Sequence, residues 1–189
     1  YNTSPMKNDT KYIDKIFGLG KINSDILTIS DGNRLTAERT GHQVYGTLKI
    51  KDEYKKNNYT LIPSGQIDLG HTKLDGYSEI GTSAISVDDQ HITTQNLRAA
   101  LALVDDLSTD KYIFKRHGKL EYLVDTDRSS SFEYNYVSDS SSILNDTLKT
   151  GALHNLNFEI GIDIVFPERF SLFAIYERNQ TFDNGYSGH

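Results

Sequence analysis

One segment of the chain has an apolar residue at every second position. From Leu156 to Phe166 every even-numbered residue is apolar, and Glu159 and Asp163 are among the residues between them. Successive side chains of a strand point to opposite faces, so this pattern predicts a strand with one apolar and one polar face. A typical globular strand has about five or six residues, whereas a strand tilted across a bilayer needs about 9–11. The length of the segment is therefore typical of a membrane-crossing strand.

Weaker versions of the same alternation recur along the chain. They occupy residues 44–52, 59–70, 112–124 and 170–178, with further candidates at 10–17 and 83–104. The segment Asn96–Leu107 fits helical and strand spacing equally well by itself, because Ala and Leu favour a helix but its apolar residues also recur every second position. Strands on both sides, and no glycine cap after Leu107, favour a strand here.

The connections between these segments are of two kinds. Short polar turns at 53–58, 105–110 and 167–168 alternate with longer loops rich in Gly, Ser, Asn and Asp near 18–34, 75–83 and 127–149. This order is typical of an up-and-down barrel in an outer membrane, which has short periplasmic turns and long external loops. We therefore expect an all-β fold, an antiparallel up-and-down outer-membrane β-barrel, with about seven strands in this chain. Closed barrels of this class have about eight strands or more, so the chain is predicted to be part of a larger barrel.

Composition excludes several classes of partner and chemistry. The 189 residues include 20 Lys and Arg against 26 Asp and Glu, a formal net charge of −6, and no run of basic residues is longer than two. Binding to nucleic acid depends on cations that neutralise phosphates, so we expect no nucleic-acid partner. The absence of Cys excludes a disulfide scaffold, a thiolate nucleophile and a Cys-ligated zinc. No run of apolar residues is long enough for a transmembrane helix.

The alternation assigns the candidate functional residues to two faces. The polar residues are expected to line a wet lumen, either as an electrostatic lining for a translocating chain or merely as a solvated surface. They are Asp68, Arg98, Lys119, Glu121, Glu159, Asp163 and Glu177. The apolar residues expected to face lipid are Leu61, Ile67, Leu69, Leu120, Tyr122, Phe158, Ile160, Ile162, Ile164, Leu172 and Tyr176.

No motif of catalytic, cofactor or metal chemistry is found in the sequence. The six His show neither H-E-x-x-H nor H-x-x-x-H spacing, and no nucleophile elbow, P-loop or G-x-G-x-x-G occurs. The acidic pairs 88–89 and 105–106 are adjacent residues that point to opposite faces of a strand, which favours solvated turns over cation sites. We expect no catalytic residue, no cofactor and no metal in this chain, and hence no enzyme.

A second hypothesis comes from the glycosylation motifs. Five Asn-x-Ser/Thr motifs occur, at Asn2, Asn8, Asn58, Asn145 and Asn179. Their number is compatible with a soluble, secreted β-sandwich that binds carbohydrate or a protein partner through its long loops. That reading requires protein, rather than lipid, to cover the apolar face of 156–164.

Four stretches, in this order, carry a resemblance to a known family. They are Ile67–Gly81, Leu97–Leu103, Gly118–Tyr122, and Phe166–Pro167 leading into Ser171–Glu177. Together with the order of the turns, they make residues 35–186 resemble the C-terminal β-domain of autotransporters, the translocator barrel of type V secretion. The most specific element is Tyr77-x-Glu79-x-Gly81, in which Glu79 is expected to pair with an Arg or Lys of a neighbouring strand.

The resemblance implies a barrel of about a dozen strands in the bacterial outer membrane, at the cell surface. It also implies three partners: outer-membrane lipid, the protein's own N-terminal passenger, and the outer-membrane assembly machinery. The function implied is a translocator and anchor that supports export of that passenger, with any enzymatic activity located in the passenger. An Ala stands where the family often has Gly in the strand Leu97–Leu103. The family's first strands with their linker helix, and its last strand, have no counterpart in residues 1–189, which are expected to be an internal piece of one β-domain.

Overall fold

The protein folds as two antiparallel β-sheets. The computed structural model describes residues 2–6, 10–30, 32–127, 129–149, 151–166 and 170–182. Thirteen strands and no helix occur in these ranges. Accordingly, this part of the chain contains no helix with the length and apolar character needed to cross a membrane.

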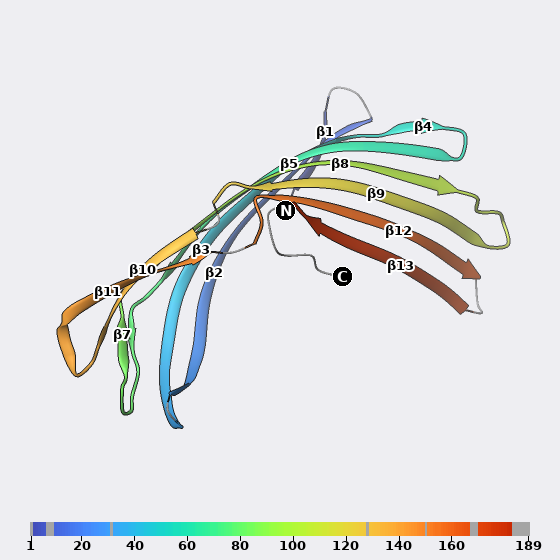
Figure 1. Ribbon diagram of the computed structural model, residues 1–189. Helices are drawn as coiled ribbons and strands as arrows, with labels where there is room; N and C mark the ends of the chain where they lie inside the picture. Colours follow the sequence, from blue (N-terminus) through green and yellow to red (C-terminus); the bar gives the residue numbers. More distant parts are fainter. Residues whose placement is uncertain are drawn as a thin grey trace.

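The larger sheet contains nine strands and carries most of the chain. Its long strands lie next to each other in chain order, which is up-and-down topology (Figure 1). In spatial order they are β1 (Asn2–Pro5), β2 (Lys11–Ser30), β3 (Asn33–Asp52), β5 (Tyr59–Leu74), β8 (Gln90–Asp106), β9 (Ile113–Asp125), β12 (His154–Phe166) and β13 (Phe170–Thr181), while β4 (Tyr54–Lys56) pairs with β5. The predicted all-β, antiparallel fold is confirmed. Seven of these strands have 12 to 20 residues, and the sheet is open, with β1 and β13 at its edges.

The register of the large sheet fixes which residues share a face. Residues directly opposite each other on paired strands lie on the same face. Leu48 of β3 is opposite Ile67 of β5, which is opposite Leu97 of β8. One position away, Thr47 is opposite Asp68, so these two residues lie on the other face. We call the first the apolar face and the second the polar face.

The smaller sheet is built from two connections of the large one. Its order is β11 (Asp139–Lys149), β10 (Ser129–Tyr136), β7 (Ile85–Val87) and β6 (Tyr77–Ser78). It lies at the end of the large sheet to which the β2–β3 hairpin extends (Figure 1). There β6 contacts β3, and β10 contacts β8.

Two of the expected loops are wrong. The β2–β3 register is continuous from Lys11 opposite Asp52 to Ser30 opposite Asn33, so most of 18–34 is strand. The segment 127–149 contains the β10–β11 hairpin. In 18–34 apolar residues such as Ile26 and Leu27 fall on both faces, so no apolar period marks a strand there. In 127–149 the Ser-, Asn- and Asp-rich composition is typical of a loop, and the alternation Phe132, Tyr134, Tyr136 is short. The expected turn at 167–168 lies outside the described residues. The segment Asn96–Leu107, by contrast, is strand β8 for almost its whole length, as expected.

Buried apolar side chains gather where the two sheets meet. Among the described residues they are Leu35, Ala84, Val87 and Ala152. None of them lies in the part of the sheet formed by β5, β9, β12 and β13. That part is a single layer of strands (Figure 1), so its apolar side chains are not covered by another layer of the described chain.

Candidate membrane-facing surface and polar face

The apolar face is exposed over the whole width of the large sheet. All eleven residues predicted to face lipid lie on this face by register. Nine of them are exposed, from 38% for Leu61 to 55% for Leu69 and Tyr176, and Ile162 and Ile164 are half-buried. On a water-soluble protein a contiguous apolar surface of this extent is unusual and marks a site of interaction.

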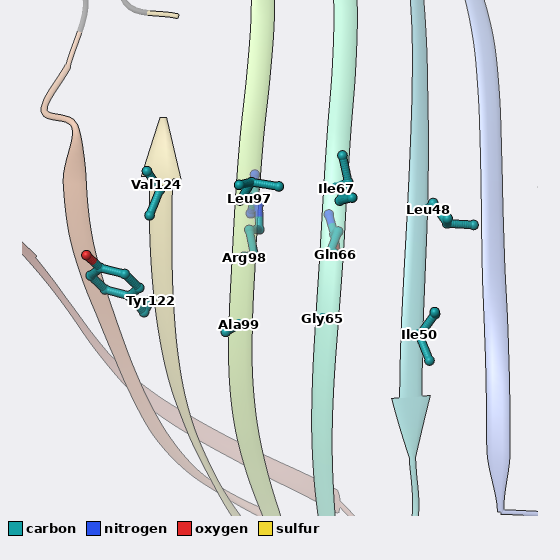
Figure 2. A pocket seen from close by; sticks show the side chains of 10 residues that line it. All are labelled: Leu48, Ile50, Gly65, Gln66, Ile67, Leu97, Arg98, Ala99, Tyr122 and Val124. Carbon is teal, nitrogen blue, oxygen red and sulfur yellow. The ribbon is translucent and has the colours of Figure 1, made fainter. Parts of the chain in front are cut away.

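A shallow groove of about 400 Å³ interrupts this face. It lies where Gly65 of β5 and Ala99 of β8 occupy neighbouring positions between Ile50 and Tyr122. Figure 2 shows the larger apolar side chains around these two small residues. Gln66 and Arg98 also line the groove from the same strands, but their register places them on the polar face.

The polar face carries a network of charged groups centred on Arg98. Arg98 Nε donates to Asp68 Oδ2 at 3.0 Å, and Arg98 Nη1 lies 3.7 Å from Glu121 Oε1. Asp68 Oδ1 also accepts hydrogen bonds from Thr47 Oγ1 at 2.7 Å and Gln66 Nε2 at 2.8 Å. The network therefore links β3, β5, β8 and β9.

Glu121 extends the network to the next strand. Its Oε2 lies 2.7 Å from Lys119 Nζ, and its Oε1 accepts a hydrogen bond from Asn157 Nδ2 at 3.2 Å. Only 8% of Glu121 is exposed, which shows how closely side chains surround it. A carboxylate this buried needs such partners, since an unpaired buried charge is strongly unfavourable.

The remaining predicted polar residues lie on the same face of β12 and β13. His117 Nε2 is 3.5 Å from Glu159 Oε1, and His117 Nδ1 is 3.8 Å from Asp163 Oδ2. Glu177 is opposite Glu159 in the register, and no ion pair of Glu177 occurs within the described ranges. All seven residues predicted for the lumen therefore share one face.

A close contact between a glycine and an aromatic ring lies on the polar face of the β2–β3 hairpin. Gly18 is opposite Tyr45, and a Cβ atom at residue 18 would overlap the Tyr45 ring. Gly20, two residues further along β2, has room for a Cβ, with Gln43 Cβ 3.8 Å away. The ring of Tyr45 thus requires glycine at residue 18 and not at residue 20.

The Tyr77-x-Glu79-x-Gly81 element packs on the outer part of the β2–β3 hairpin. Glu79 is buried and accepts hydrogen bonds from Thr28 Oγ1 at 2.8 Å and from the backbone N–H of Ile85 at 3.2 Å. The partners of Glu79 are therefore a hydroxyl and a backbone amide, instead of the Arg or Lys expected from sequence. Gly81 has φ +143°, and a side chain there would overlap Leu35.

Arg39 holds the start of the same element. Its guanidinium lies 5.2 Å from the centroid of the Tyr77 ring, and its Nε donates to the backbone carbonyl of Asp75 at 2.9 Å. Burial raises the pKa of the Tyr77 hydroxyl, and the nearby Glu79 carboxylate raises it further, while Arg39 opposes both effects. The element is thus a packing contact between the long β5–β8 connection and the hairpin.

A family model of the autotransporter beta-domain matches residues 5–177. The chain belongs to the autotransporter β-domain family. No curated protein sequence matched it at significant similarity. The matched residues of this autotransporter β-domain extend from the last residue of β1 into β13, and so contain both faces and the Tyr77-x-Glu79-x-Gly81 element.

Sequence reasoning missed one charged pair of the autotransporter β-domain on the apolar face. Asp105 of β8 is only 4% exposed and forms an ion pair with Arg116, the residue opposite it on β9. Arg116 is also opposite Ile162 of β12. A break in the apolar alternation, Arg116 at an even position of 112–124, was the available signal. On β8 and β9 this pair interrupts the apolar face near the short turns, and Phe114 of β9 and Ile164 of β12 continue the face beyond it.

Proposed function

We propose that this β-domain is an outer-membrane barrel segment that supports export of an N-terminal passenger to the cell surface. The observation that carries the proposal is the separation of the two faces. A continuous exposed apolar face spans seven long strands, while the other face carries an ion-pair network. In hydrocarbon every backbone N–H and C=O needs a partner, and closed barrels of strands provide it.

The polar face lines the lumen in this proposal. The ion-paired carboxylates of β5, β9 and β12 on this face are 10% to 34% exposed, less than the nine exposed residues of the predicted lipid-facing set. A lumen wall with paired charges presents alternating hydrogen-bond donors and acceptors to an extended passenger segment. Such a wall has no single dominant binding site.

The resemblance adds partners to the proposal. The passenger would precede this β-domain in the chain, and the assembly machinery of the outer membrane would insert the barrel. The family match supports a translocator and anchor role in general. Membership of a translocator family also supports the expectation that any enzymatic activity lies outside these residues.

The chain contains no Cys, so a single Cys introduced at one position can be labelled specifically. Two adjacent positions of β8 provide the test. Ala100 lies on the polar face and Leu101 on the apolar face. We expect Ala100→Cys, in the full-length protein inserted in outer membranes, to react with a small water-soluble maleimide. Leu101→Cys should react with a membrane-confined reagent and be protected from the soluble one.

The same experiment reports on export. A passenger stalled during secretion should form crosslinks with a probe at Ala100→Cys and none with a probe at Leu101→Cys. Unboiled protein should also migrate faster than boiled protein in SDS gels, as closed barrels resist SDS. Equal labelling of both positions by the soluble reagent, with one gel band at both temperatures, would reject the barrel in favour of the secreted sandwich.

A further inference from the structure

A row of basic side chains crosses four strands on the apolar face. Lys21 of β2 is opposite His42 of β3, which is opposite Lys73 of β5, which is opposite His91 of β8. These residues are far apart in sequence, and only the register makes them neighbours. Lys21, His42 and His91 are exposed, and the Lys73 side chain is 44% exposed.

The row lies at the boundary of the apolar face on the side of the long connections. Towards the short turns, the rows on this face contain Leu19 and Val44, then Phe17 and Leu69. In the opposite direction, the next row of the hairpin pairs Asn23 with Thr40, and the row after it pairs Asp25 with Glu38. Along the hairpin the face therefore changes from apolar to basic, then to uncharged polar, and then to acidic.

Some of these groups already have partners. Lys73 Nζ lies 2.7 Å from Asp89 Oδ2 and 3.9 Å from Asp75 Oδ1, so its charge is largely neutralised. His91 stacks on His71, with Nδ1 and Nε2 3.3 Å apart. Lys21 and His42 form no ion pair with any residue that the structure describes. The hairpin therefore provides the least compensated part of the row.

We propose that this row, with Lys21 and His42 at its centre, binds the phosphate groups of outer-leaflet lipids. The inference rests on the proposed insertion in the outer membrane. An anionic headgroup is complementary in charge to the row, and its acyl chains would lie on the adjacent Leu19, Val44 and Phe17. The acidic pair beyond the row repels phosphate, which confines the headgroup to this level of the protein.

The test compares phosphorylated and dephosphorylated lipid A as probes on the full-length protein refolded in a zwitterionic detergent. The double variant Lys21→Gln, His42→Gln removes the least compensated groups. The control is Lys56→Gln, Lys111→Gln, two exposed lysines beside the short turns, at the opposite end of the strands. Binding of a fluorescent lipid A is measured at low salt, with inorganic phosphate as a competitor.

We expect the double variant to bind lipid A at least about fivefold more weakly than the wild type, because one lysine near a lipid surface contributes about fivefold. The control should bind like the wild type, and dephosphorylated lipid A should bind weakly to all three proteins. Equal binding by the double variant, or equal binding of dephosphorylated lipid A, would reject the proposal. Competition by millimolar inorganic phosphate would show a free-phosphate site and reject the lipid as the ligand.

The gel mobility of each protein, boiled and unboiled, separates this proposal from the proposed function. A wild-type protein without a heat-dependent shift would reject both. A wild-type protein and a double variant with the same heat-dependent shift and the same affinity for lipid A would reject the lipid site alone.

Discussion

At the scale of single residues, the position within a cross-strand row decides the environment of a side chain. Leu120 on the apolar face is opposite Leu101 and Phe158. Ile162 is on the same face but is opposite Arg116, next to the Arg116–Asp105 ion pair. The sequence alternation places Leu120 and Ile162 on the same face without distinguishing them. Their cross-strand neighbours show that they lie at different depths of the apolar face.

Because the two residues lie at different depths, an Arg substitution should lower the free energy of unfolding by different amounts at each. Leu120→Arg should lower the free energy of unfolding in lipid vesicles by about 2–4 kcal/mol, which is the cost of an Arg near a bilayer midplane. Ile162→Arg should lower it by about 0–1 kcal/mol, which is the cost of an Arg near the membrane interface. Denaturant titration followed by gel mobility measures both. The matched control is Ala100→Arg on the polar face, opposite Glu121, which should change stability little. Equal losses in all three variants would contradict the assignment of faces and depth.

Glycine at residue 18 is the second prediction at this scale. Gly18→Ala should destabilise the barrel by about 1–3 kcal/mol, because the added methyl group overlaps the Tyr45 ring and overpacking has costs of this size. Gly20→Ala should be nearly neutral, since its Cβ has room. Tyr45→Ala in the Gly18→Ala background should remove the overlap. If the double variant loses as much stability as the two single variants together, the contact between residue 18 and the Tyr45 ring is not the cause of the destabilisation.

At the scale of elements, the β2–β3 hairpin and the smaller sheet support each other. Each hairpin strand has 20 residues, and its outer part carries Leu35 and Arg39, which pack on residues 75–85. A hairpin of two strands is by itself marginally stable in water. The β5–β8 connection adds the buried contacts that hold its outer part in place.

Glu79 is the residue to change in this contact. Glu79→Ala should leave the membrane part of the sheet intact but open the 75–89 connection, because Thr28 and the Ile85 amide lose a charged acceptor whose hydrogen bonds contribute about 1.5–3 kcal/mol. Limited proteolysis of refolded protein should show faster cleavage within 75–89. Thr82→Ala, an exposed position in the same connection, is the control. Unchanged proteolysis of Glu79→Ala would show that the connection is held by other contacts.

At the scale of the whole molecule, an open sheet with an exposed apolar face cannot stay dispersed in water. Both edge strands of the described sheet, β1 and β13, have one side without a partner strand, and β13 exposes Phe170, Phe173 and Ile175. Unpaired edges and large apolar surfaces favour association. The apolar face lacks a second layer in the described part of the protein, whereas a sandwich requires one.

Residues 1–189 by themselves should therefore aggregate in aqueous buffer and become dispersed in detergent. Size-exclusion chromatography with light scattering, in buffer with and without detergent micelles, provides the measurement. A monodisperse monomer in buffer would contradict the exposed apolar face and support the soluble sandwich.

The sequence by itself determined the strands of the large sheet and the two faces they present. Side-chain direction alternates with every residue of a strand, so residues such as Asp163 and Ile164 reveal their faces locally. The sequence failed for 18–34, because its apolar residues fall on both faces, and for 127–149, because its Ser-, Asn- and Asp-rich composition is typical of a loop. Which residues become neighbours across strands was decided only by the tertiary structure. Lys21, His42, Lys73 and His91 form one row, and Glu79 meets Thr28, because register aligns distant segments and no local pattern encodes that alignment.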